Sequence, residues 1–158
     1  ANNYRWRFNL QTGEVREGDI DDLNTEFNVT NQLFHGVQTK HAYHQYIPRL
    51  AEGGHTLRFT ALIKYNNETG QYDRWDYGDG VFGSEVAIAP PKGATRDTVK
   101  EDDGYAVSMV IDSNTWKSEA LVFDAKDITQ GPIARVQLPH RVPVGFHATW
   151  ARGEDFFT

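Results

Sequence analysis

Alternation of apolar and polar residues, repeated along the whole chain, restricts the fold more than any other feature of this sequence. In residues 4–10 and again in residues 57–65, every second side chain is aromatic or aliphatic. Successive side chains of an extended strand point to opposite faces, so each segment is predicted to be a strand with one apolar side. The apolar positions are Tyr4, Trp6, Phe8 and Leu10 in the first segment and Leu57, Phe59, Ala61, Ile63 and Tyr65 in the second.

Turns rich in Gly, Asn and Asp join such segments into hairpins. Three hairpins are expected, over residues 4–15, 57–75 and 105–123. Further short strands are expected at 133–138 and 146–150, and only residues 124–128 favour a single helical turn. Short strands separated by polar turns at a spacing of roughly 8–12 residues predict an all-β fold, and the pattern leaves sandwich, barrel and propeller open. The plan that the three hairpins share resembles the blades of a propeller.

Composition excludes several classes of function for this chain. The formal charge is −6 and Lys and Arg form no basic stripe, so no nucleic-acid partner is expected. Cysteine is absent, which excludes disulfides, zinc–thiolate sites and cysteine nucleophiles, and a reducing cytoplasm fits this absence. No apolar run approaches the length of a transmembrane segment. The sequence also lacks the GxSxG motif of hydrolases and the phosphate-binding P-loop.

Six histidines are the first candidates for metal ligands. His41 and His44 lie three residues apart in a predicted strand and so point to opposite faces, which prevents them from binding one metal. We interpret both as surface residues or as packed polar residues. His55 follows two glycines and His140 lies between Pro and Arg, so both are expected in loops.

His147 has a different setting, because it lies in the apolar segment 142–150. A buried imidazole needs either a hydrogen-bond partner or a metal, and the residues alone leave both readings open, the hydrogen-bonded core histidine being the more common one. Glu26 and Glu85 raise the same question, since a carboxylate on an apolar strand needs a donor. That donor is either a local polar group or the ring N–H of a metal-bound histidine.

Six short motifs, taken in order, resemble the C-terminal region of the carotenoid cleavage oxygenases. They are Asn2–Trp6, Asn24–Phe27, Gly83–Glu85, Glu101–Tyr105, Ser118–Asp127 and Leu138–His147. These motifs extend over nearly the whole chain, and the branch that they resemble most is that of the lignostilbene dioxygenases and apocarotenoid oxygenases. The chain also begins directly in a predicted strand without an initiator Met, so residues 1–158 are expected to be the C-terminal part of one larger domain.

The resemblance implies a seven-bladed β-propeller that holds iron(II) on its axis with four histidines. By position, His147 matches the last of these ligands, and the other three would lie in the upstream part of the same protein. Glu26 and Glu85 match glutamates that accept hydrogen bonds from ligand histidines. Phe146, next to the ligand, is expected to line the substrate cavity.

The implied function is cleavage of a carbon–carbon double bond by O₂, which gives two carbonyl products. The substrate would be an apolar conjugated molecule, either a stilbene of the lignostilbene or resveratrol kind or an apocarotenoid. Two positions depart from the family's usual motifs: Val86 replaces a common Pro, and Ala148 replaces a common Gly and would narrow the space beside the iron. The alternatives are a non-catalytic β-propeller binding module, which would be expected to have lost His147 or a glutamate, and an isolated inactive fragment.

Overall fold

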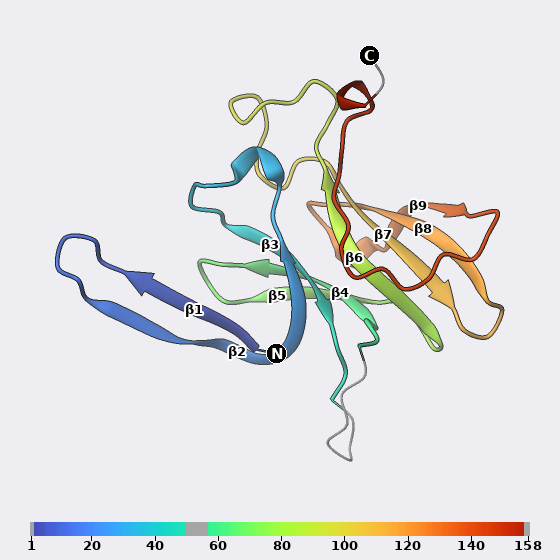
Figure 1. The fold of residues 1–158 in the computed structure, drawn as a ribbon, viewed down its shortest axis with the longest axis horizontal. Helices are drawn as coiled ribbons and strands as arrows, with labels where there is room; N and C mark the ends of the chain where they lie inside the picture. The colour runs from blue at the N-terminus through green and yellow to red at the C-terminus, as the bar shows by residue number, and fades with distance from the viewer. Residues whose placement is uncertain (1, 50–56, 157–158) are drawn as a thin grey trace.

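The computed structural model describes residues 2–49 and 57–156 and contains two antiparallel sheets (Figure 1). The first sheet consists of β1 (Asn2–Phe8), β2 (Val15–Val29), β3 (His41–Tyr46), β4 (Ala61–Asn66) and β5 (Tyr72–Asp76). The second consists of β6 (Val81–Ala89), β7 (Tyr105–Asp112), β8 (Lys117–Asp124) and β9 (Pro132–Gln137). Short 3-10 turns lie at η1 (Gln32–Phe34), η2 (Ile128–Gln130) and η3 (Gly153–Asp155). The described residues contain no α-helix, and the all-β prediction is confirmed.

The three predicted hairpins form as β1–β2, β4–β5 and β7–β8. Each sheet is a meander, because its spatial order follows the chain order. The second hairpin differs from its prediction at its beginning: regular pairing of β4 starts only at Ala61, while Phe59 forms an isolated bridge to Gly83 of β6. The N–H of Gly83 donates to the carbonyl of Phe59 at 2.8 Å, so this part of the chain connects the two sheets.

Two further predictions of local structure are wrong. The helical turn expected at 124–128 forms at η2 instead, because the Asp127 side chain accepts the N–H of Thr129 and caps the turn there. The strand expected at 146–150 does not form, and this segment has no regular structure. Its alternating pattern suits a strand, but its N–H groups bond to side chains, as Ala148 does to Glu85, and not to a neighbouring strand.

The main core lies where the two sheets meet. It contains residues from both of them: Tyr43, Leu62, Tyr77, Val86, Ile88, Ala106, Val110, Leu121, Phe123, Ala125 and Ile128. Two tyrosine hydroxyls in this core are bonded across the interface, Tyr43 to the carbonyl of Ala125 at 2.6 Å and Tyr77 to the Ser108 hydroxyl of β7 at 3.3 Å. The Tyr77 hydroxyl also bonds to Gln45 of β3 at 2.9 Å. Burial raises the pKa of Tyr77 to about 12, so its hydroxyl stays a neutral donor.

The strand predicted at 57–65 was expected to have one apolar side, but its second half, in β4, is buried on both sides, while Leu57 at its start is 56% exposed. All residues from Ala61 to Tyr65 are buried, because Leu62 faces the main core while Ile63 and Tyr65 belong to a second apolar cluster with Ala42 on the other face. A central strand covered on both faces loses the polar positions that an edge strand keeps. The sequence pattern of β4 predicted one buried face, whereas the structure buries both of its faces.

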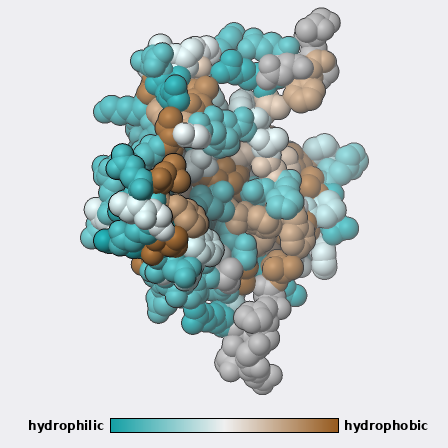
Figure 2. All heavy atoms as spheres, turned by 60° about the vertical axis from the view of Figure 1, so that its left-hand side comes forward, coloured by the Kyte–Doolittle hydropathy of each residue, from teal (hydrophilic) through white to brown (hydrophobic). Residues whose placement is uncertain are grey.

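The β1–β2 hairpin shows the opposite behaviour. It extends away from the two sheets (Figure 1), and its aromatic side is exposed to solvent within the described residues. Trp6 keeps 56% of its surface exposed, and the Tyr4 ring packs against that of Trp6, with ring centroids 4.5 Å apart. Figure 2 shows apolar side chains, in brown, reaching the surface among polar ones on the side of the molecule that carries this hairpin.

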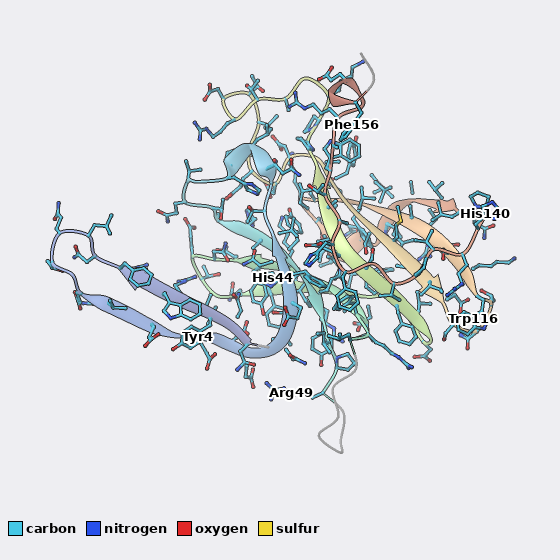
Figure 3. All side chains as sticks on the ribbon, viewed as in Figure 1. Tyr4, His44, Arg49, Trp116, His140 and Phe156 are labelled. Atoms are coloured by element: carbon cyan, nitrogen blue, oxygen red, sulfur yellow. The ribbon has the colours of Figure 1, made fainter. Side chains whose placement is uncertain are left out.

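Three of the histidines lie where the sequence predicted. His41 is 3.5 Å from the carboxylate of Asp102, whereas His44 packs edge-on against Tyr65, so the two histidines contact different partners. His140 lies in an exposed connection at the outer edge of the second sheet (Figure 3). His55 is outside the described residues.

Candidate metal-ligand site

The segment after β9 returns along β6 and joins the two sheets; we call residues 138–152 the strap (Figure 1). Ser118 of β8 accepts the N–H of Val142 at 2.9 Å and anchors the start of the strap. At its other end, the side-chain amide of Gln32 donates to the Thr149 hydroxyl at 2.6 Å and to the Trp150 carbonyl at 3.1 Å. Because Gln32 belongs to η1, next to the first sheet, the strap is fastened to both sheets.

Both predicted glutamates lie at β-bulges. The pairing of β2 with β3 shifts between Glu26 and Val29, and that of β6 with β7 shifts between Gly83 and Val86, so each long strand carries one extra residue. Bulges re-aim side chains and are enriched next to functional sites. In β6 the side chains of Ser84 and Ser108 restore bonds lost at the bulge. Ser84 accepts the Met109 N–H at 3.2 Å, and Ser108 donates to the Ser84 carbonyl at 3.0 Å.

The bulge in β2 also places Phe27 in a left-handed conformation, with φ of 56°. A bulky residue there is strained by about 1–3 kcal/mol, and such strain persists where the surroundings hold the residue in place. The Phe27 ring packs edge-on against Phe59, with centroids 5.3 Å apart, and against His147, with centroids 5.0 Å apart. The strained residue thus contacts the histidine that the sequence indicated as a ligand.

Glu85 and His147 form the centre of the site. Nδ1 of His147 lies 3.3 Å from Oε2 of Glu85, and the same oxygen accepts the N–H of Ala148 at 2.5 Å. Glu85 is 11% exposed, so its carboxylate is held in a nearly dry position. A carboxylate next to Nδ1 favours the tautomer with hydrogen on Nδ1, which leaves the Nε2 lone pair available to a metal.

The exposure of His147 differs from the prediction of a buried ring. Its side chain is 81% exposed, and among the described residues Phe27 is the aromatic side chain that packs on its ring. The reason is the conformation of the strap, which runs over β6 without pairing as a strand and so carries no sheet above it. The ring is fixed at Nδ1 and open on its other side.

The other two predicted site residues, Glu26 and Phe146, have fewer contacts that relate to a metal site. Glu26 is half-buried opposite Gln45 and forms no ion pair with any histidine of the described residues. Phe146 is half-exposed, and its ring lies edge-on to Phe27 with centroids 6.1 Å apart. Phe146 therefore extends the aromatic surface around His147, which is compatible with a place in the wall of a cavity.

The described part of the chain contains no group of three or more His, Asp or Glu residues that could hold a metal ion. Among the described residues, both His41 and His147 have a carboxylate partner at one ring nitrogen, but the His41 side chain is only 18% exposed, whereas that of His147 is 81% exposed. The geometry of His147 therefore fits a ligand, because Glu85 orients one ring nitrogen and the ring is open on its other side. A single imidazole leaves most coordination positions of an iron ion unfilled. A complete metal site would therefore need further ligands from beyond the described residues.

The bulges, the strained Phe27 and the anchoring residues Ser118 and Gln32 were not anticipated from the sequence. A signal existed for the bulge in β6, because the polar residues Ser84 of β6 and Ser108 of β7 interrupt apolar strands and are both buried. The left-handed conformation of Phe27 had no signal, because phenylalanine is not a residue that favours it.

Comparison with known proteins identifies the class to which this fold and site belong. The family described as retinal pigment epithelial membrane protein (RPE65) matches residues 1–152. The chain belongs to this family, which is that of the carotenoid cleavage oxygenases.

Among its curated relatives, carotenoid 9,10(9',10')-cleavage dioxygenase 1 of Arabidopsis thaliana is 34% identical over 96% of this chain and 29% of its own length. The enzyme of the same name from Pisum sativum is 35% identical over 92% of this chain and 28% of its own length. The chain thus spans less than a third of the length of these relatives.

Solved structures agree with the assignment. The crystal structure of Pseudomonas brassicacearum lignostilbene dioxygenase is 29% identical, with a TM-score of 0.79 over 95% of this chain and 32% of that chain. Cobalt-substituted Synechocystis apocarotenoid oxygenase, at 23% identity, shares the fold with a TM-score of 0.80 over 94% of this chain and 30% of that chain. The two sheets therefore correspond to the C-terminal part of the β-propeller of these oxygenases, as predicted.

The described residues include no helix of the length and apolar character needed to span a bilayer.

Proposed function

We propose that this chain supplies one ligand, His147, to the iron(II) of a dioxygenase that cleaves a carbon–carbon double bond with O₂ to give two carbonyl products. The observation that carries the proposal is the contact of 3.3 Å between Nδ1 of His147 and Glu85, in a chain of the carotenoid cleavage oxygenase family. A surface histidine has no need of a nearly buried carboxylate, whereas a ligand histidine does.

In this proposal Glu85 is a positioning residue. Its carboxylate holds the proton on Nδ1, raises the basicity of Nε2 and fixes the plane of the ring. The Ala148 N–H donates to the same carboxylate and so ties the strap to β6 at the residue after the ligand. Iron(II), when bound, supplies the activation of O₂.

The aromatic side chains around His147 have a second role in the proposal. Phe27 and Phe146 form an apolar surface beside the imidazole, and the fully buried Phe59 packs against Phe27. Such a surface excludes water and suits a conjugated apolar substrate. We propose Phe146 as part of the cavity wall, on the side of the ring that Glu85 does not occupy.

Residues 1–158 are then the C-terminal part of a single propeller domain with seven blades. The upstream part of the same protein would contribute three further histidine ligands, and Glu26 would orient one of them from the bulge of β2. The length of the relatives supports this arrangement, since the chain covers 29% of the Arabidopsis thaliana dioxygenase. The cytoplasmic location stays a prediction, and one relative is named as chloroplastic.

The relatives leave two substrate classes for this proposal. One solved relative is a lignostilbene dioxygenase, and the curated relatives are carotenoid cleavage dioxygenases. Metal analysis of the full-length protein that contains this chain, followed by product analysis with one stilbene and one apocarotenoid, tests the proposal. Iron together with two carbonyl products from either substrate is expected. A protein loaded with iron that cleaves neither would contradict the proposed reaction.

The two alternatives predict different results. A non-catalytic binding module would bind an apolar ligand without iron, but His147 and both glutamates are retained here. An isolated fragment would be recovered as a lone chain of 158 residues, which mass spectrometry under denaturing conditions detects directly. One histidine holds iron(II) poorly against water, and open sheet edges promote aggregation, so active material is expected to contain the upstream part.

A further inference from the structure

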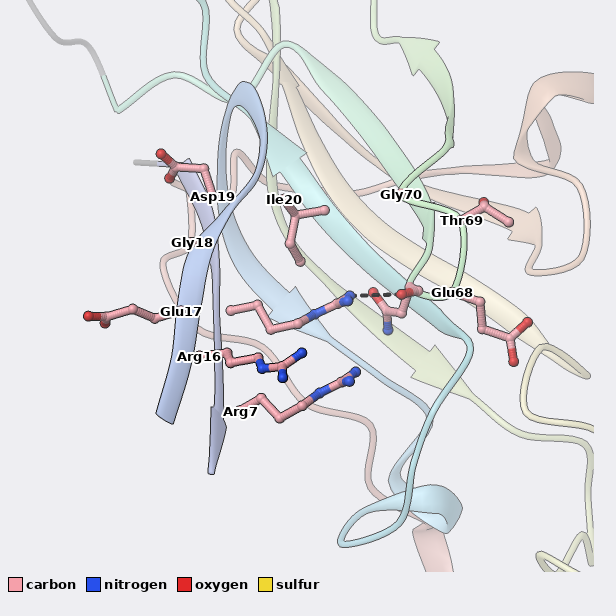
Figure 4. A pocket seen from close by; sticks show the side chains of 11 residues that line it. Arg7, Arg16, Glu17, Gly18, Asp19, Ile20, Glu68, Thr69 and Gly70 are labelled. Carbon is pink, nitrogen blue, oxygen red and sulfur yellow. Dashed lines mark hydrogen bonds between the residues drawn. The ribbon is translucent and has the colours of Figure 1, made fainter. Parts of the chain in front are cut away.

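A hollow of about 410 Å³ lies between the β1–β2 hairpin and the turn that joins β4 to β5 (Figure 4). Its walls include the hairpin residues Arg5 and Arg7 of β1, residues 16–20 of β2, among them Arg16, Glu17 and Asp19, and the turn residues 67–70. None of these residues belongs to the site around His147. In Figure 4 the side chains of Arg7 and Arg16 extend from the hairpin toward the turn.

The register of the hairpin places these arginines on one face. Arg7 lies directly opposite Arg16, and Arg5 lies opposite Gly18, so the three guanidinium groups leave the same side of the two strands. Like charges directly opposite each other on antiparallel strands destabilise the pair. An anion between them removes this repulsion.

The carboxylates near the hollow do not neutralise it. Glu17 and Asp19 lie opposite Trp6 and Tyr4, on the aromatic face of the hairpin, and in Figure 4 both point away from the arginines. Glu68 in the turn is 3.7 Å from Lys40, which lies outside the hollow. Only Glu14, bonded to Arg16 at 2.8 Å, shares the arginine side. Glu17, Asp19 and Glu68 also line the hollow, but the side chains of Glu17 and Asp19 leave the opposite face of the hairpin, so the three arginines share their face with one carboxylate, that of Glu14.

The arginines differ in how they are engaged. Arg5 donates to the carbonyl of Asn67 at 2.7 Å and fixes the distance between hairpin and turn. Arg7 forms no hydrogen bond or ion pair within the described residues. Ile20 and Gly70 both line the hollow, and a β-carbon added at Gly70 would lie 3.8 Å from the Ile20 side chain, so hairpin and turn approach each other there. An unpaired guanidinium in a preformed hollow can bind without rearrangement of the backbone.

We propose that Arg5, Arg7 and Arg16 form a binding site for a phosphate group, either free or carried by a lipid headgroup. A guanidinium offers parallel N–H donors that match phosphate oxygens. The oxygens of a tetrahedral anion point in several directions, so several guanidinium groups around one hollow can each bond to it. A planar carboxylate is fully bonded by one or two guanidinium groups. The site is independent of the proposed dioxygenase reaction.

Titration calorimetry of the full-length protein with inorganic phosphate, at fixed ionic strength in chloride, tests the site. Saturable binding is expected, and Arg7→Gln should weaken it at least about tenfold, because one charged donor pair is lost. Arg7→Lys keeps the charge without the fork and should give an intermediate loss. Arg96→Gln, which removes an exposed arginine from the connection between β6 and β7, is the matched control and should leave binding unchanged.

A second arm separates the two sources of phosphate. Vesicles of phosphatidylcholine, with and without phosphatidic acid, are sedimented with wild type and with Arg7→Gln. Retention that requires phosphatidic acid and is lost in Arg7→Gln supports the site and assigns the group to a lipid headgroup. Binding of inorganic phosphate without such retention supports a free anion. Absence of both, or equal binding by folded Arg7→Gln and wild type, overturns the proposal. Circular dichroism verifies that the variants are folded.

Discussion

The site around His147 and the β1–β2 hairpin are built in contrasting ways. At the site, two strands depart from regular pairing, a strained Phe27 is held in place, and Glu85 is nearly buried beside its histidine. The hairpin keeps regular pairing from Tyr4 to Phe8, yet both of its faces are exposed, one aromatic and one basic. The most specific side-chain geometry is therefore found around His147, where the backbone is irregular and lies over a packed core. The regularly paired hairpin has no comparable arrangement.

The largest difference between the two regions is expected from His147→Ala in the full-length protein. Loss of a ligand should abolish iron loading and double-bond cleavage, whereas Arg7→Gln in the hairpin should leave both unchanged. Metal analysis and product analysis of the two variants measure this. Full iron occupancy in His147→Ala would rule out the ligand role and with it the proposed function.

Truncation of a core side chain should lower the free energy of unfolding much more than a substitution in the hairpin. Phe123 is fully buried between the sheets and packs edge-on against Trp75, with ring centroids 5.0 Å apart. Phe123→Ala should lower the free energy of unfolding by about 3–5 kcal/mol through lost burial and a residual cavity. Denaturant titration measures it. A loss below about 1 kcal/mol would mean that the sheets do not share a rigid core.

Acid should destabilise the core through His44. Burial lowers the pKa of His44 to about 4, whereas the unfolded chain has a value of about 6.5. Below pH 6.5 the unfolded state binds a proton that the folded state does not, so this stability is complete above pH 6.5 and declines as the pH falls to 4. The decline amounts to about 3 kcal/mol.

The variant His44→Phe keeps a ring against Tyr65 but removes the titration. Its free energy of unfolding should therefore depend less steeply on pH between 6.5 and 4 than that of wild type. Denaturant titrations at several pH values compare the two proteins. Parallel pH profiles would place the acid sensitivity in other groups.

A smaller effect is expected from Glu85→Gln, which keeps the shape of the side chain and removes its charge. Residues that orient metal ligands typically contribute about 10–100-fold to metal affinity or activity. The variant should fold normally and lose activity within this range, with weaker iron retention against a chelator. A matched control is Glu119→Gln, which changes a carboxylate of β8 that pairs with Arg135. Unchanged turnover in Glu85→Gln would reduce Glu85 to an anchor of the strap.

The smallest effect should come from Trp6→Ala on the aromatic face of the hairpin. Trp6 is 56% exposed and packs against the Tyr4 ring, and a substitution at such a surface position typically changes stability by less than about 1 kcal/mol. Thermal or denaturant unfolding of the full-length protein measures it. A loss of several kcal/mol would show instead that another part of that protein covers this face, and it would end the contrast between the hairpin and the core.

Much of the fold could be predicted because strands and turns depend on neighbouring residues. Alternation at 4–10 and 57–65 and the turn at 66–70 act over a few positions, and the corresponding hairpins form as expected. The strand predicted at 146–150 does not form, because strand formation also depends on residues far away in the chain. Its residues have the right pattern, but a strand also needs a partner, and the local pattern contains no information about one.

In the candidate site, too, some features follow from the sequence and others from long-range contacts. The sequence by itself predicts which residues would carry the chemistry, because His147, Glu26 and Glu85 stand in motifs of a recognisable order. Only the tertiary structure decided that Glu85 meets His147, that Phe27 packs on the ring, and that the strap is fastened by Ser118 and Gln32. These contacts join residues far apart in the chain, and they depend on bulges whose position follows from packing between sheets and not from the propensity of any single residue.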